Sequence, residues 1–203
     1  KQKEYDLARE KGLEPYRVSV ALDGIAVFLN ESNPVKNLTF AQLKGIYTGA
    51  ITNWKEVGGG DARIIVYGRE NNSGTYAFFK EHVLNEEDYS DYTQTLPGTA
   101  AVVNAVSKDV NGIGYGGIAW ATGVKFAAVA KDDNSPFIEP SVEAVSNGTY
   151  PISRDLYWFF AGKPTGELKK LLNWALSEKG QKISESIDYV PLPMEAAKKY
   201  MVD

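Results

Sequence analysis

Strand-like and helix-like hydrophobic patterns alternate along most of this chain, and that alternation limits its fold more than any other feature. Strand patterns occupy residues 16–22, 25–29, 63–67, 113–117, 125–130 and 156–161. Helical patterns occupy residues 2–10, 40–48, 75–84, 99–107, 142–147 and 165–177, with further helical turns after Gly180 and from Met194. Strands that alternate with helices in this way predict an α/β fold.

The composition excludes several kinds of function. The 203 residues carry a formal net charge of −4, which gives no broad attraction to nucleic acid or anionic lipid. Cysteine is absent, so disulfides, thiolate metal sites and cysteine nucleophiles are excluded. The single histidine, His82, lies in the helical pattern FFKEHVL, where we expect a helix-surface residue. No apolar stretch approaches the roughly 18–20 residues of a transmembrane helix. We expect no metal and no cofactor.

The segment between the strand pattern at 63–67 and the helical pattern at 75–84 carries a candidate anion site. Arg69 offers a planar guanidinium that matches two oxygens of a tetrahedral oxyanion. Ser73 is in position to cap the helix, Gly74 lets the backbone come close to a ligand, and Thr75 adds a hydroxyl in the first turn. A helix N-terminus presents unpaired N–H groups and a partial positive charge, so it stabilises an anion without net charge on the protein.

The same segment also has a simpler interpretation, in which Ser73 only caps the helix and Arg69 pairs with a surface carboxylate such as Glu70. Two catalytic motifs are absent. No lysine precedes a hydroxyl residue as in a P-loop. No G-x-S-x-G elbow is present, and Ser73 has no histidine in the loop to activate it. Taken alone, the segment leaves the cap and the anion site both open.

Short sequence segments through nearly the whole chain form an ordered series. They are DGIAV (23–27), NP (33–34), LT (38–39), QL (42–43), IYTG (46–49), NW (53–54), R-x-x-x-SGT (69–75), IGY (113–115), YPISR (150–154), S-x-x-GQ (177–181) and YVPL (189–192). In this order they resemble the phosphate-binding proteins of phosphate ABC transporters, within the type II periplasmic-binding-protein superfamily.

The resemblance implies a type II periplasmic-binding-protein fold, in which two α/β domains close over one phosphate. Residues 23–150 would form a complete domain II, and residues 1–22 with 151–203 would form part of domain I. Arg69, Ser73, Gly74 and Thr75 would be the contribution of domain II to the phosphate site.

The family's N-terminal portion, with a hydroxyl-bearing loop and an aspartate that accepts the ligand's proton, has no counterpart before Lys1. We therefore expect one complete and one partial α/β domain, and a chain that binds phosphate weakly or not at all alone. Asp23 could substitute for that aspartate, but we expect it in an Asp-Gly turn where the domains cross.

The function that the resemblance implies is capture of inorganic phosphate and its delivery to the two transmembrane permease subunits of an ABC transporter. Such a protein is a monomer without catalytic activity, located in the periplasm or anchored outside the membrane. Two alternatives stay open. One is a binding or sensing module of the same fold for another oxyanion. The other is a phosphoryl-transfer enzyme or ester hydrolase that uses Arg69 and the helix N-terminus as an oxyanion clamp.

Overall fold

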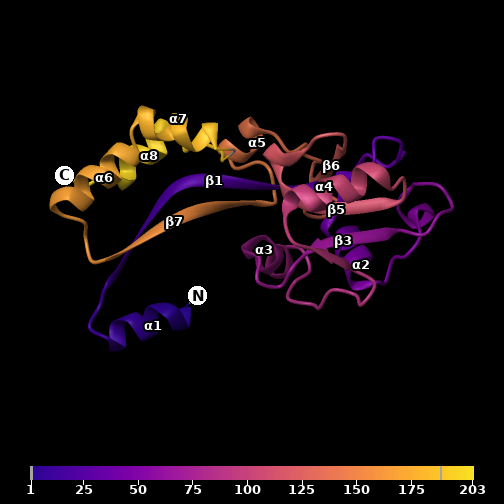
Figure 1. Ribbon diagram of the computed structural model, residues 1–203, viewed down its shortest axis with the longest axis horizontal. Helices are drawn as coiled ribbons and strands as arrows, with labels where there is room; N and C mark the ends of the chain where they lie inside the picture. Colours follow the sequence, from indigo (N-terminus) through magenta and orange to yellow (C-terminus); the bar gives the residue numbers. More distant parts are fainter. Residues whose placement is uncertain (1, 188) are drawn as a thin grey trace. The chain divides into compact units, whose positions relative to one another are not determined.

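The computed structural model describes residues 2–187 and 189–203. The chain divides into two compact units. Unit 1 comprises Lys1–Asp23 and Arg154–Asp203, and unit 2 comprises Gly24–Ser153. These boundaries lie close to the predicted domain borders, although the assignment of the units to domains I and II of the family remains a prediction. Two strands, β1 (Pro15–Leu29) and β7 (Ser153–Ala161), extend across the boundary and pair with each other (Figure 1).

Strand β1 corrects one prediction, because it runs unbroken through the expected Asp-Gly turn. Asp23 is 8% exposed and its carboxylate pairs with Arg154 rather than closing a turn. At Gly24 an added Cβ would lie 2.6 Å from Val145 Cγ2. The glycine is therefore needed for close packing, and the two predicted strands are one.

Unit 2 is built on a mixed sheet in the order β2-β6-β1-β5-β3-β4. Its other strands are β2 (Asn37–Thr39), β3 (Ile65–Arg69), β4 (Gln94–Leu96), β5 (Gly112–Gly117) and β6 (Lys125–Ala130). Strand β1 is antiparallel to β5 and β6, whereas β3 is parallel to β4 and β5. Strand β3 begins and ends two residues later than predicted, so Arg69 is its last residue. The three-residue strands β2 and β4 were missed because such short segments show no periodicity.

The helices of unit 2 confirm the predicted patterns. They are α2 (Phe40–Thr48), α3 (Gly74–His82), α4 (Thr99–Lys108) and α5 (Val142–Ser146), with 3-10 helices η1 (Trp54–Val57) and η2 (Ile118–Trp120). Thr39 caps α2 in a reciprocal capping box with Gln42, and Gly49 ends the helix in the left-handed conformation, at φ 84°. The local signals at both ends of α2 were therefore sufficient to place it.

Helix α4 packs directly on the backbone of β5, where glycines leave room for it. A Cβ at Gly114 would lie 2.4 Å from Val102 Cγ1, and one at Gly116 would lie 2.3 Å from Thr99 Cγ2. Real side chains do not approach so closely, so only glycine at these positions lets α4 settle against the strand. Figure 1 shows α4 beside β5 in this arrangement.

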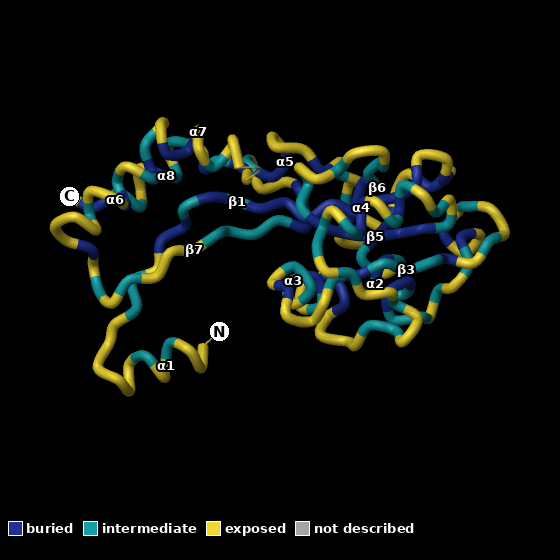
Figure 2. Tube along the Cα trace, in the orientation of Figure 1, coloured by how far each residue is buried: buried dark blue, intermediate teal, exposed yellow. Residues whose placement is uncertain are grey.

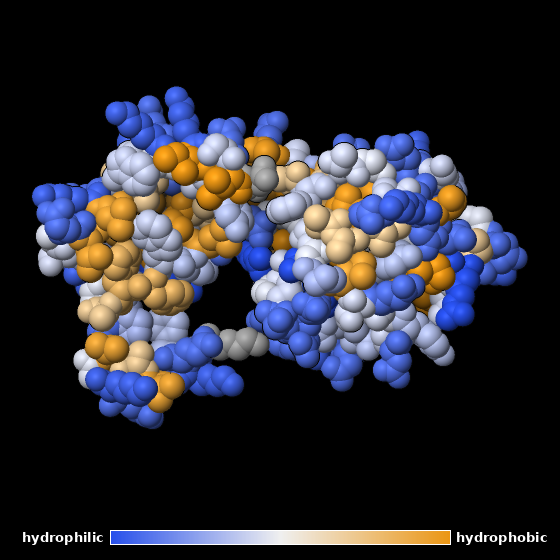
Figure 3. Space-filling model, viewed as in Figure 1, coloured by the Kyte–Doolittle hydropathy of each residue, from blue (hydrophilic) through white to orange (hydrophobic). Residues whose placement is uncertain are grey.

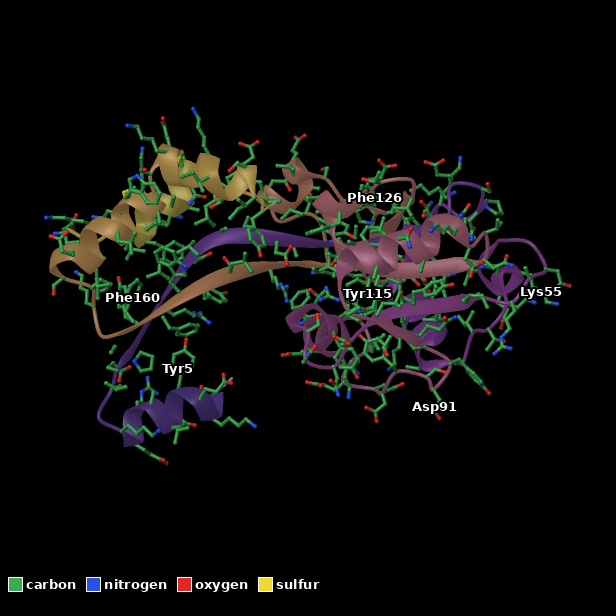
Figure 4. All side chains as sticks on the ribbon, in the orientation of Figure 1. Tyr5, Lys55, Asp91, Tyr115, Phe126 and Phe160 are labelled. Atoms are coloured by element: carbon green, nitrogen blue, oxygen red, sulfur yellow. The ribbon has the colours of Figure 1, made fainter. Side chains whose placement is uncertain are left out.

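Aromatic side chains cover the other face of the same strand. Tyr115, between the two glycines, points away from α4 because successive residues of a strand face opposite sides. Its ring stacks on Phe79 of α3, with 4.1 Å between centroids, and meets Tyr47 of α2 edge-on at 5.4 Å. Figure 4 labels Tyr115 in the interior of unit 2. The sheet is thus covered on both faces, as the α/β pattern predicts.

Unit 1 combines parts of β1 and β7 with α1 (Gln2–Glu10), α6 (Gly166–Ala175), α7 (Glu178–Ser186) and α8 (Met194–Tyr200). Its buried core comprises Val18, Leu172, Leu176, Leu192, Ala197 and Val202. Helix α1 has no buried residue (Figure 2). Its Tyr5, labelled in Figure 4, meets Phe159 of β7 edge-on, with 5.8 Å between ring centroids. Within the described residues, no helix has both the length and the apolar character needed to cross a bilayer.

Candidate functional site

The candidate anion residues lie where β3 gives way to α3. Arg69 ends β3, and the backbone N–H of Ser73 donates to the carbonyl of Glu70 at 2.9 Å, which closes a tight turn. Helix α3 starts at Gly74. Because β3 and β4 are parallel, the loops that follow them leave the same edge of the sheet. The N-termini of α3 and α4 therefore both begin near the strand end that carries Arg69.

The Arg69 guanidinium has one protein acceptor among the described residues. Its Nη1 donates to the hydroxyl of Thr99 at 2.9 Å. Its Nε is fully buried and has no hydrogen-bond partner there. No ion pair with Glu70 or another carboxylate is found within residues 2–187 and 189–203, so the simpler pairing considered from the sequence is wrong. Arg69 is thus a partly buried cation with an unmatched donor.

Ser73 is the N-cap of α3, as predicted. Its Oγ accepts from the backbone N–H groups of Thr75 and Tyr76 at 3.2 and 3.4 Å, and the residue is 9% exposed. A hydroxyl that accepts in this way still has its own proton to donate. Gly74 is the first residue of α3 and Thr75 the second, so the structure places all three residues in and just before the first turn.

A pair of tyrosines fixes that first turn against the sheet. Tyr89 donates to the carbonyl of Tyr76 at 3.1 Å, and its oxygen lies 2.8 Å from the hydroxyl of Tyr115 on β5. Since the single Tyr89 proton is used, Tyr115 donates the second bond. Burial raises the pKa of Tyr115 to about 12 and that of Tyr89 further still, so both hydroxyls stay protonated at neutral pH.

Thr99 is a residue beside Arg69 that sequence reasoning missed. It is the first residue of α4, and the preceding Gly98 supplies no side-chain cap. The segment Gly98-Thr99 before a helix has the same small and hydroxyl-bearing character as Ser73-Gly74-Thr75. That likeness was the available signal, but only the structure places Thr99 against Arg69, 30 positions earlier in the chain.

A polar cavity beside this turn has the wrong charge for an anion. It has a volume of about 450 Å³ and is lined by Glu70, Asn71, Asn72, Tyr76, Tyr89, Ser90, Asp91, Thr93 and Thr95. Two carboxylates and no cation line it, so Arg69 is the better centre for an oxyanion.

His82 lies on the surface of α3, as the sequence predicted. It is exposed, its ring stacks on Phe78 with 4.0 Å between centroids, and its Nδ1 lies 3.1 Å from the Phe78 carbonyl. In the part of the chain that the structure describes, no three His, Cys, Asp or Glu side chains are grouped to hold a metal ion.

The chain is similar in sequence and in fold to known phosphate-binding proteins. The family model described as a PBP superfamily domain matches residues 1–179. The phosphate-binding protein PstS of Pseudomonas aeruginosa is 37% identical over 205 residues, covering 93% of this chain and 64% of the relative. The chain therefore spans about 64% of the length of such curated relatives.

Two solved structures are similar over most of the chain. A Vibrio cholerae ABC-type phosphate transport receptor has a TM-score of 0.77 at 29% identity, covering 88% of this chain and 73% of its own. A Clostridium perfringens protein, described as a phosphate ABC transporter substrate-binding protein and holding bound phosphate, has a TM-score of 0.75 at 34% identity. It covers 91% of this chain and 74% of its own. The predicted α/β fold class is confirmed.

Proposed function

The chain belongs to the phosphate-binding proteins of the PBP superfamily, and from that membership we propose that it binds inorganic phosphate through Arg69, Ser73, Gly74 and Thr75. Arg69 supplies the charge and a planar pair of donors. The hydroxyls of Ser73 and Thr75 and the first turn of α3 supply further donors and a favourable helix dipole.

One observation supports this proposal most directly: the unmatched guanidinium of Arg69. Its Nε is buried without an acceptor, and no described carboxylate neutralises its charge. An unpaired buried donor costs about 1–3 kcal/mol, and more when it is charged. A tetrahedral oxyanion supplies both the acceptor and the charge. Since these 203 residues carry a formal net charge of −4, local geometry has to hold the ligand.

We propose that the bound phosphate is delivered to an ABC transporter. The relatives are described as a phosphate-binding protein and a phosphate transport receptor, which are binding and transport activities rather than catalysis. By the same likeness, the protein is a monomeric, non-enzymatic receptor located in the periplasm or anchored outside the membrane. Its partners would be the two transmembrane permease subunits.

We propose further that unit 1 is completed by polypeptide outside these 203 residues. Strand β7 pairs only with β1 among the described strands, so one of its edges is open. Trp158, Trp174 and Ile183 are exposed and line an apolar groove of about 360 Å³. Figure 3 shows hydrophobic residues gathered on the visible face of this unit. About a third of the relative's own sequence lies outside the part that this chain matches, which is enough to cover such a surface.

Titration of the 203-residue chain with inorganic phosphate, followed by amide NMR, tests the site. We expect shifts at Ser73–Thr75 only at millimolar phosphate, because unit 1 is incomplete. Arg69→Ala should abolish them. In a protein with a completed unit 1, Arg69→Ala should cost several kcal/mol of binding free energy and Thr75→Val about 1–3 kcal/mol.

Arg63→Ala is the matched control, since Arg63 lies before β3 and its guanidinium stacks on Tyr92 at 5.2 Å. An absent response in the parent, or an equal response in Arg69→Ala, would reject the proposed site. Sub-micromolar affinity of the parent would reject the proposed incompleteness of unit 1.

Two further measurements separate the alternative functions. Sulfate that displaces phosphate at equal concentration would favour a general oxyanion module. Turnover of a phosphate ester that disappears in Arg69→Ala would favour a hydrolase. Neither result is expected, and no described histidine contacts Ser73 to activate it.

A further inference from the structure

We propose that Thr99 is a positioning residue that presents one particular edge of the Arg69 guanidinium to the anion. This inference rests on the proposed phosphate site and specifies which atoms of Arg69 bind. The edge is formed by Nε and Nη2, because Nη1 is already held by Thr99.

The argument begins with the geometry of the guanidinium group. Its three nitrogens lie in one plane, and its N–H groups form two forks that can each match two oxygens. One fork joins Nη1 with Nη2, and the other joins Nε with Nη2. The hydrogen bond from Nη1 to Thr99 Oγ1, at 2.9 Å, uses one of the two N–H groups of Nη1, so this nitrogen is already engaged by the protein.

The second fork contains the unmatched donor. Arg69 Nε is shielded from solvent and has no hydrogen-bond partner among the described residues. A buried donor left unpaired is costly, so native structures nearly always provide a partner. An oxyanion that accepts from Nε and Nη2 removes this cost and leaves the bond to Thr99 intact.

Thr99 is itself held rigidly enough to orient its neighbour. It starts α4, and its methyl group packs on Gly116 of β5, where an added Cβ would lie only 2.3 Å away. A β-branched side chain has few rotamers available in a helix, and the contact with Gly116 restricts them further. The Thr99 oxygen therefore has a fixed position relative to the sheet that carries Arg69.

Two substitutions isolate the contribution of the Thr99 oxygen. Thr99→Val keeps the branched shape that fits Gly116 but removes the acceptor. Thr99→Ser keeps the acceptor and removes the methyl group. In phosphate titrations followed through the Arg69 Nε–H signal and the amides of Ser73–Thr75, we expect Thr99→Val to weaken binding about tenfold, the size of one hydrogen bond to a charged group. Thr99→Ser should bind within about twofold of the parent, since its hydroxyl still accepts from Arg69.

Arg69→Lys supplies the background that separates positioning from direct contact. Lysine keeps the charge but has no fork to orient. In that background Thr99→Val should have no further effect on phosphate affinity, whereas a direct contact between Thr99 and the anion would still be lost. An effect of Thr99→Val that persists in the Arg69→Lys background would therefore overturn the positioning role.

The outcomes distinguish this inference from the proposed function. If the parent shows no phosphate response at Arg69 or Ser73–Thr75, the proposed function itself fails. If the parent responds and Thr99→Val binds equally well, only the role of Thr99 fails. Equal weakening by Thr99→Ser and Thr99→Val would also overturn it, because the hydroxyl would then not be the important group. Thermal unfolding of each variant checks that the fold is retained.

Discussion

Asp23 and Arg154 form an ion pair within unit 1, with 2.8 Å between Asp23 Oδ2 and Arg154 Nη2. The Arg154 Nε also donates to the same oxygen, at 3.1 Å. Burial raises the pKa of Asp23 above its ordinary value, although the charge and hydrogen bonds of Arg154 act in the opposite direction. The desolvation of this carboxylate is therefore only partly offset by its partner.

Replacing Arg154 by methionine should lower the free energy of unfolding at neutral pH by roughly 3 kcal/mol, because a buried carboxylate is left without its cation. An acid whose folded-state pKa is raised stabilises the fold fully below its unfolded pKa, near 3.8 for Asp23, and this contribution is lost as the pH rises through the folded-state value. Arg154→Met raises the folded-state pKa of Asp23 further, so the loss of unfolding free energy in this variant should shrink at acidic pH. Urea denaturation of the parent and the variant at several pH values measures that loss.

Arg9→Met is the control for this experiment, because the Arg9–Glu14 pair has a similar length of 2.9 Å but both side chains are exposed. It should change stability little at any pH. A deficit in Arg154→Met that grows toward acidic pH would contradict the expected role of the Asp23 charge.

Gly116→Ala should destabilise unit 2 by about 1–3 kcal/mol, because the new methyl group overlaps Thr99 on α4. The loss should be partly recovered by Thr99→Ser, which removes the overlapping Cγ2 atom. Gly60→Ala is the matched control, since a Cβ there meets nothing within 4 Å. Chemical denaturation gives the unfolding free energies of the parent, Gly116→Ala, Gly116→Ala with Thr99→Ser, and Gly60→Ala. Equal stability of Gly116→Ala and Gly60→Ala would show that α4 can move away from β5.

Alkaline pH should destabilise unit 2 through its buried tyrosines. Burial raises the pKa of Tyr115 from 10.0 to about 12. Its contribution to stability is full below the unfolded value near 10 and is lost as the pH rises through the folded value, a change of about 2–3 kcal/mol. Tyr115→Phe should make the fall in unfolding free energy between these pH values shallower. Tyr92→Phe, at an exposed position, should leave it unchanged, and equal slopes in both variants would contradict the role of Tyr115.

The apolar surface of unit 1 gives a fourth test. Trp174→Gln should be tolerated in the 203-residue chain, where this side chain is 47% exposed, and should reduce binding of a hydrophobic dye. In a longer protein in which unit 1 is completed as proposed, the same change should cost about 3 kcal/mol of unfolding free energy, because the ring would then be buried. Trp120 in unit 2 has a similar exposure of 51%, and Trp120→Gln should leave the unfolding free energy unchanged in both the 203-residue chain and the longer protein. Neutrality of Trp174→Gln in the longer protein would mean that nothing covers the surface.

The sequence predicted features that depend on local signals. Thr39 and Gly49 define α2 through capping chemistry that neighbouring residues supply, and Ser73 does the same for α3. It could not predict contacts between distant segments. The partner of Asp23 lies 131 positions away, and without it the Asp-Gly pair reads as a turn. Pairing with β4 also extends β3 to Arg69. This extension could not be predicted, because β4 is too short to show a pattern of its own.

The same limit applied to the candidate site. Arg69 and the first turn of α3 could be found because strand, cation and cap follow one another in the chain. Thr99 could not, because its relation to Arg69 depends on the parallel pairing of β3 with β4 and on the glycines that bring α4 onto β5. The residues proposed to bind were accessible to sequence reasoning, whereas the residue proposed to orient them was not.

The position of β1 at the centre of the unit 2 sheet has a consequence for biosynthesis. The apolar run Ile25–Leu29 is made early, but its two partner strands, β5 and β6, follow only after residue 112. At ordinary translation rates this segment waits on the order of ten seconds before either partner leaves the ribosome. During that interval it is an unpaired hydrophobic strand, the kind of nascent segment that chaperones bind and that aggregates when they are scarce.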